Sequence, residues 1–359
     1  MQRRFYLDLA DAGLAMPIGT DLVLRAQPDA EAILLDGTRL GQVLEQAARR
    51  FDTPLALPTM DLELEKQFLL QTLGVPASVM PTFHFAGCPG DGAAAILRDG
   101  LHGPLSPRMQ AMADAIGYVA ANTDLVPFGM CIGPFSLMTK LLADPIVPIA
   151  LAGSGITADM DTSVRAVEET LDLAISVILR YVDAQIKAGA KGIFVAEPAA
   201  NAVYLSPRMI DAGSDIFDRY VMKYNLRIRA LLAAWDVDLA FHCCGELTDY
   251  MVQRFASLEP SILSLGSSRK LWEDARLIAD DIVMFGNLPS KRFFSDGEIT
   301  AAEVQAQAGE LVERMREVGQ PFILGTECDV LSVPGCEAVI QTKIDAMLQV
   351  RQPSAALTR

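Results

Sequence analysis

Short apolar runs alternate along this chain with longer segments of helical periodicity, and this alternation constrains the fold more than any other feature. Runs of this length are typical of buried strands. Strands that alternate with helices form parallel sheets, and eight of them predict a single α/β domain, a (β/α)8 barrel of the TIM type. The runs cover residues 53–57, 82–86, 126–132, 192–196, 237–241, 261–265, 282–285 and 321–324.

The barrel is expected to occupy residues 53–352 as the catalytic domain. Residues 1–52 are expected to form a short N-terminal helical extension, because apolar residues from Leu40 to Phe51 recur there at helical spacing. The run at 82–86 is ambiguous, since the Gly-Cys-Pro-Gly sequence that follows it also suits a hairpin.

The longest helix is expected from Ser163 to Ala188, ending at Gly189. The stretch before it, residues 144–161, contains proline and several glycines. This stretch is interpreted either as a lid or entrance loop, or as a surface insertion without a role.

The net charge and the cysteine content limit which classes of partner and which cellular compartment are expected. The chain has 359 residues, is 51% hydrophobic and carries a net charge of −15, which argues against nucleic acid or an anionic membrane surface as a partner. No apolar run reaches the roughly 18 residues that cross a bilayer, and Asp8 interrupts any signal-peptide core near the start. Six cysteines without a short secreted framework favour a reducing, cytoplasmic location.

Polar side chains follow several of the apolar runs. A barrel of this type builds its active site at the carboxyl ends of its strands, so these residues are the expected site. They are Asp61, Glu197, His242, Cys244, Asn287 and Cys328.

His242 and Cys244 predict part of a metal site. They end one apolar run, and the period of two in a strand places them on the same face, while Cys243 points the opposite way into packing. Cys328 is the expected third ligand, with Cys336 as its rival. Three protein ligands leave one position free, which is typical of a catalytic zinc site rather than a structural one.

Several motifs make the chain resemble the uroporphyrinogen decarboxylase superfamily over most of its length. They are Phe128-Gly129-Met130-Cys131-Ile132-Gly133-Pro134-Phe135-Ser136, Ala188-Gly189-Ala190-Lys191-Gly192-Ile193, Glu197-Pro198-Ala199-Ala200, Leu205-Ser206-Pro207 and Phe285-Gly286-Asn287-Leu288. The pattern His242-x-Cys244-Gly245 with Cys328 is more similar to the zinc-dependent methylcobamide:thiol methyltransferases, of the coenzyme M type, than to the decarboxylases. The arginine-rich N-terminal motif of the decarboxylases is missing, because Arg49-Arg50 lacks its spacing and glycine.

The resemblance implies a (β/α)8 barrel, zinc held by His242, Cys244 and Cys328, and a corrinoid carried on a partner protein. It places Asp61 near an active-site aspartate of the decarboxylases. Some relatives have a carboxylate beyond the sixth strand, where this chain has Gly266-Ser267-Ser268.

The remaining site predictions rest on position along the chain. Glu197 is expected to support His242, since a metal-bound histidine usually donates its other N–H to a carboxylate or carbonyl. An ordinary acid bound to backbone amides is the alternative for both Glu197 and Asp61. Gly133 and Pro134 either turn the chain or let a ligand approach the backbone. Asn287 either orients a ligand or caps the next helix.

The expected function is zinc-dependent methyl transfer between a corrinoid protein and a thiol or another small acceptor, in either direction. Two alternatives stay open at this stage. One is a decarboxylase of the uroporphyrinogen type, and the other is a non-catalytic barrel that binds a corrinoid or a metal. The sequence leaves open whether the chain works alone or as a homodimer.

Overall fold

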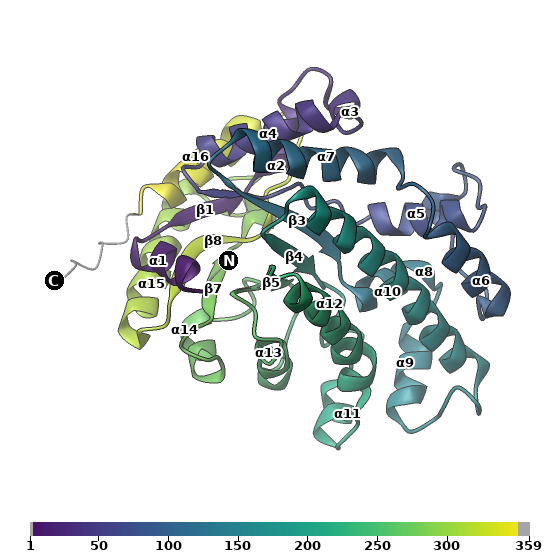
Figure 1. Cartoon of the computed structure of the whole chain (residues 1–359). Helices are drawn as coiled ribbons and strands as arrows, with labels where there is room; N and C mark the ends of the chain where they lie inside the picture. Colours follow the sequence, from purple (N-terminus) through teal and green to yellow (C-terminus); the bar gives the residue numbers. More distant parts are fainter. Residues whose placement is uncertain (1–2, 351–359) are drawn as a thin grey trace.

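Eight parallel strands form one curled sheet, which confirms the predicted TIM-type α/β barrel (Figure 1). The computed structural model describes residues 3–350. The sheet order is β1-β8-β7-β6-β5-β4-β3-β2, so sequential strands are neighbours except where the barrel opens between β1 and β2. The strands are β1 (Ala15–Ile18), β2 (Leu55–Ala56), β3 (Val126–Ile132), β4 (Gly192–Ala196), β5 (Asp238–Cys243), β6 (Ile262–Leu265), β7 (Val283–Leu288) and β8 (Phe322–Asp329).

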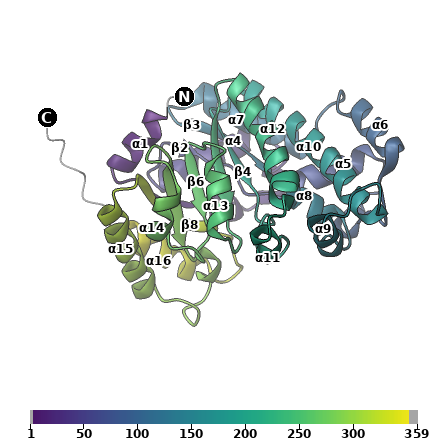
Figure 2. The same cartoon turned by 90° about the horizontal axis from the view of Figure 1, so that it is seen from below.

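Helices surround the outside of the sheet, as Figures 1 and 2 show from two directions. They are α1 (Arg4–Asp11), α2 (Thr20–Arg25), α3 (Ala30–Ile33), α4 (Gly37–Arg50), α5 (Leu64–Thr72), α6 (Gly90–Gly100), α7 (Pro107–Asn122), α8 (Pro134–Leu141), α9 (Ile146–Gly153), α10 (Thr162–Ala188), α11 (Pro207–Asp211), α12 (Lys223–Ala234), α13 (Asp249–Ala256), α14 (Leu271–Asp274), α15 (Ala301–Val318) and α16 (Glu337–Leu348). Within residues 3–350, no helix is both long enough and apolar enough to cross a membrane.

The second predicted strand, residues 82–86, is wrong, and one strand of the barrel was not predicted. Residues 82–86 are not a strand, because they follow a turn of 3-10 helix and make only one isolated bridge, from Phe85 to Leu142. The eighth strand of the sheet is instead β1, which lies within residues 1–52 and pairs with β8. The expected helical extension is therefore continuous with the barrel sheet. The expected barrel domain ends at residue 352, outside the described residues.

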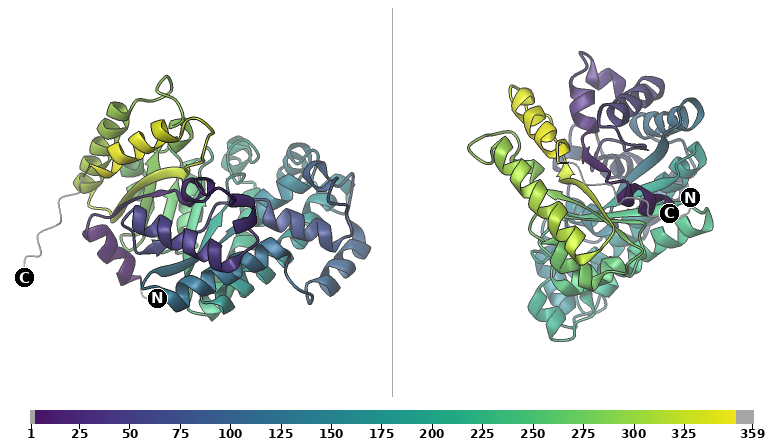
Figure 3. Two further views of the ribbon diagram at one scale, coloured as in Figure 1. Left: turned by 90° about the horizontal axis from the view of Figure 1, so that it is seen from above. Right: turned by 90° about the vertical axis from the view of Figure 1, so that its left-hand side faces the viewer.

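Aromatic side chains fill the interior of the barrel near the amino ends of its strands. Phe128, Phe194 and Phe285 belong to one buried cluster with Tyr6 of α1. The Tyr6 hydroxyl donates a hydrogen bond to Asp238 Oδ2 over 3.1 Å, and Asp238 is the first residue of β5. Helix α1 thus lies at the amino ends of the strands, and the opposite end is left for a functional site. The left view of Figure 3 shows α1 in purple, beside the barrel.

Side chains complete the barrel wall where β2 is too short to pair with the whole of β3. Beyond the pair Ala56–Pro127, the Gln185 side chain accepts a bond from Met130 N (2.7 Å) and donates one to Met130 O (2.9 Å). Glu65 Oε1 accepts from Ile132 N over 3.1 Å. Complete burial raises the pKa of Glu65 to about 8, so this carboxyl is largely protonated at neutral pH.

The stretch at residues 144–161 contains helix α9 rather than an irregular loop. Ile149 and Ala152 are buried, whereas Ile146 and Val147 are exposed. Arg219 donates to Ala152 O over 2.7 Å, which ties α9 to the segment after β4. Helix α10 then begins after an Asp161 cap.

Candidate metal centre

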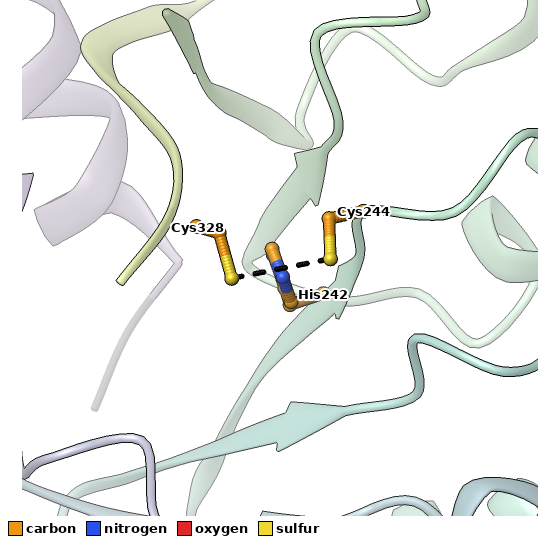
Figure 4. A group of neighbouring side chains, drawn as sticks. All are labelled: His242, Cys244 and Cys328. Carbon is orange, nitrogen blue, oxygen red and sulfur yellow. Dashed lines mark hydrogen bonds between the residues drawn. The ribbon is translucent and has the colours of Figure 1, made fainter. Parts of the chain in front are cut away.

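The ligand atoms of His242, Cys244 and Cys328 converge at the carboxyl ends of β5 and β8 (Figure 4). All three lie within 4.8 Å of one another, and the two Sγ atoms are 3.9 Å apart. His242 is the penultimate residue of β5, and Cys244 follows that strand directly. Cys328 is the penultimate residue of β8. The structure therefore brings together the three residues that the sequence singled out.

Strand alternation explains which cysteines take part. Cys243 is fully buried and its Sγ lies 3.9 Å from Ala200 O, within the core outside the barrel, as expected for a packing residue. Cys336 lies at the start of α16 and does not belong to the convergent group found within residues 3–350. Cys328, rather than Cys336, is thus the third member of the cluster.

The environment of His242 suits a metal ligand. Its Nδ1 lies 2.9 Å from Ser264 Oγ, and Ser264 is its register partner on β6. Its Nε2 is buried and, among the described residues, has no hydrogen-bond partner. An Nδ1–H donated to Ser264 leaves the Nε2 lone pair free, which is the tautomer that a metal requires. The buried, unpaired nitrogen is therefore available as a ligand atom.

The thiols of Cys244 and Cys328 change each other's pKa because their sulfur atoms are in contact. The contact with the Cys328 sulfur lowers the pKa of Cys244, and His242 and Lys291 add to this effect. The same contact with Cys244 raises the pKa of Cys328. The electrostatics of the pair thus favour the thiolate form of Cys244 over that of Cys328. A divalent cation would also remove the proton of Cys328, because it stabilises thiolates strongly.

Two residues that sequence reasoning missed lie beside this cluster. Met60, in the loop after β2, places its Sδ 3.8 Å from Cys328 Sγ. Lys291 follows β7, and although burial disfavours its ammonium group, Cys244, Glu327 and Cys328 together raise its pKa. Met60 precedes the predicted Asp61, and that proximity was the only available signal for it.

Of the two alternatives for Glu197, the structure shows the acid bound to backbone amides rather than a side chain that supports His242. The buried Glu197 carboxylate turns to the start of α8, accepting from Ser136 N (2.6 Å) and Phe135 N (3.3 Å), and it also accepts from Asn225 (3.0 Å). Amides at a helix N-terminus attract a carboxylate, and this attraction decides the rotamer. Glu197 reaches His242 only through its backbone N–H, which donates to His242 O over 2.8 Å.

Gly133 and Pro134 lie where the buried Glu197 carboxyl group meets the start of α8. A Cβ atom at Gly133 would lie 2.2 Å from the Glu197 carboxyl group, so any larger residue there would have to displace that buried group. Pro134 is the first residue of α8, where its missing N–H costs nothing. Of the two alternatives for these residues, the structure shows the first: the chain turns here and packs against the buried carboxyl group of Glu197.

Asp61 and Asn287 also make structural contacts. Asp61 Oδ2 forms an ion pair with Arg108 over 2.6 Å, and its Oδ1 accepts from Glu63 N over 3.0 Å. Asn287 donates to Gly266 O (2.8 Å) and to the carbonyl of Arg269 (2.9 Å), so it holds the loop after β6 instead of capping a helix. Neither side chain belongs to the convergent cluster.

The fold and the site define a class of protein, a TIM-type α/β barrel that carries an imidazole and two thiols at the carboxyl ends of its strands. Within that class, the sequence profile described as Uroporphyrinogen decarboxylase (URO-D) matches residues 42–343. The chain belongs to this family, which confirms the resemblance.

A solved structure named as a methyltransferase from Methanosarcina mazei is similar in fold, with a TM-score of 0.65. It is 16% identical in sequence, and the match covers 97% of this chain and 99% of that one. No curated protein sequence matches the chain.

Proposed function

We propose that the protein is a zinc-dependent methyltransferase of a corrinoid methyl-transfer system, acting between a corrinoid protein and a thiol or other small acceptor. The observation that carries the proposal is the convergence of His242, Cys244 and Cys328, with one buried imidazole nitrogen left without a partner. Family membership and the fold shared with a named methyltransferase support the same proposal.

The donor set fits zinc by its chemistry. One imidazole and two thiolates are ligands that Zn²⁺ prefers, and three of them leave a position for a substrate. Bound there, the metal would hold an acceptor thiol as a thiolate at neutral pH, where a free thiol with a pKa near ~8.5 is only a few per cent ionised.

Residues around the three ligands orient the His242 ring and offset the negative charge of the sulfurs. Ser264 fixes the ring of His242 from the neighbouring strand. Lys291 brings a positive charge toward the two sulfurs, which offsets the negative charge that an additional thiolate would add. Because the ligands stand on two strands of a packed barrel, little reorganisation is needed when a substrate arrives.

The methyl group would move as a cation equivalent. The new sulfur–carbon bond forms as the cobalt–carbon bond of a methylated corrinoid breaks, and the electron pair of the broken bond stays with the corrinoid. The acidic surface of this chain, with a net charge of −15, suits a partner whose docking face is basic.

The contacts of the arginines disfavour decarboxylation. Binding several substrate carboxylates requires free cationic groups near the barrel mouth. Arg49 and Arg50 end α4 in the outer shell, where they contact Asp124 and Gln341. Arg108 is already paired with Asp61.

The decisive experiment combines metal analysis with thiol-dependent demethylation of free methylcobalamin, followed by its absorbance. We expect one zinc per chain and demethylation that requires an added thiol, with both lost in Cys328→Ser. The matched control is Cys336→Ser, which should keep both. Folded protein that binds no zinc when zinc is supplied, or zinc-loaded protein without thiol-dependent turnover over a thiol panel, would overturn the proposal.

A further inference from the structure

We propose that Met60 supplies a fourth, thioether ligand to the metal centre, so that the resting donor set is one imidazole, two thiolates and one thioether. The proposal rests on the zinc binding proposed above and extends it to a residue outside the predicted triad. The observation behind it is the 3.8 Å separation between Met60 Sδ and Cys328 Sγ.

Two of the sulfur–sulfur separations match those of atoms that share one ion. Tetrahedral zinc with zinc–sulfur bonds of about 2.3 Å places any two sulfur ligands about 3.8 Å apart. The Cys244–Cys328 separation is 3.9 Å and the Met60–Cys328 separation is 3.8 Å. Cys328 is common to both pairs, so the thioether approaches the cluster from the side of β8.

The loop that carries Met60 is tied to the cysteine end of β8. Met60 N donates to Asp329 Oδ2 over 3.4 Å, and Asp329 directly follows Cys328. One residue further on, Asp61 is held by Arg108. The backbone of the loop is therefore held at Met60 and at the next residue, which keeps this side chain next to Cys328.

A thioether is suited to a replaceable position. It is neutral, so the centre with Zn²⁺, two thiolates, one imidazole and one thioether has no net charge. It is also a weaker donor than a thiolate, and the unbranched methionine side chain can swing aside at low cost. Met60 would thus keep water from the centre until the sulfur of an acceptor takes its place.

The test is zinc K-edge X-ray absorption on the zinc-loaded, full-length protein. Wild type should fit three sulfur scatterers and one nitrogen, whereas Met60→Leu should fit two sulfurs, with a nitrogen or oxygen in place of the third. The matched control is Met112→Leu on α7, a buried methionine in the outer helical shell, which should leave the spectrum unchanged.

Selenomethionine labelling tests the same point without any substitution. A selenium scatterer should replace one sulfur in the first shell of zinc. Two sulfurs in wild type and in Met60→Leu, or no selenium within bonding distance, would overturn the assignment while leaving the proposed function intact. Protein that binds no zinc would overturn both.

Discussion

Replacing Ser264 by alanine should weaken zinc binding without changing the set of ligands. Ser264 is completely buried, and its hydroxyl is the partner of His242 Nδ1 at 2.9 Å. Alanine leaves that nitrogen buried without a partner, at a cost of about 1–3 kcal/mol. It also releases the ring from the tautomer that presents Nε2. Loss of such a supporting bond typically lowers metal affinity by roughly 10- to 100-fold, which is about 1.4–2.7 kcal/mol.

The chain offers a close control just before the start of the same strand. Ser261 is also buried, but its hydroxyl bonds to Asp238 at the amino end of the barrel. The measurement is zinc affinity by competition with a chelator, together with thermal unfolding of the zinc-free proteins. Ser261→Ala should lower stability and leave zinc affinity within about threefold of wild type.

An equal change of zinc affinity in the two serine variants would refute this reasoning. So would a Ser264→Ala protein that binds zinc as tightly as wild type, because the ring would then be oriented by something other than the β6 hydroxyl. Ser264→Thr retains the hydroxyl and should recover most of the lost affinity.

Three further predictions concern packing, oxidation and pH. Gly133→Ala should lower the free energy of unfolding by about 1–3 kcal/mol, measured by urea denaturation, because its Cβ would overlap a buried carboxyl group. Zinc-free protein treated with hydrogen peroxide should form a Cys244–Cys328 disulfide, each bond consuming one peroxide and releasing two waters, because the sulfurs are 3.9 Å apart. Stability should fall as pH rises from about 4.5 toward 8, since folding raises the pKa of Glu65 and the unfolded chain binds fewer protons there.

Each of these has its own control. Gly309→Ala, where a Cβ meets nothing within 4 Å, should leave stability equal or slightly higher. Zinc loading should protect the two cysteines, and equal disulfide yields by peptide mass analysis with and without zinc would contradict the shared site. Glu65→Gln, which keeps the acceptor for Ile132 N, should flatten this part of the pH profile, and an unchanged slope would assign it to another group.

Most of the sheet was predictable because its strands are continuous apolar runs. The miss at β1 has a physical cause. That strand has only four residues and includes Pro17, so it shows neither the length nor the pattern of a buried strand. Residues 82–86 have the composition of a strand, but a single bridge leaves them in irregular structure. Tertiary pairing, rather than local pattern, decides both cases.

The metal triad was accessible from sequence because strand ends and the period of two place its members. The residues that support the triad could not be predicted in this way. Ser264 meets His242 through the register between β5 and β6, and register depends on the packing of the whole sheet. Glu197 shows the converse limit: its position at a strand end was predictable, but the choice between its two alternatives was made by the amides of α8, which set the direction of the side chain.

The two strands between β5 and β8 explain how ligands so far apart in sequence keep a common geometry. Asn287 at the end of β7 holds the carbonyl of Gly266 after β6 (2.8 Å). Glu327 of β8 accepts from the amide (3.0 Å) and hydroxyl (2.7 Å) of Ser267 in the same loop. These bonds join the ends of β6, β7 and β8 beside Cys328, so the wall between the two sulfurs is fixed before any cation binds. Because a preorganised site needs little folding to bind metal, removing zinc should lower affinity for substrate far more than it alters the backbone.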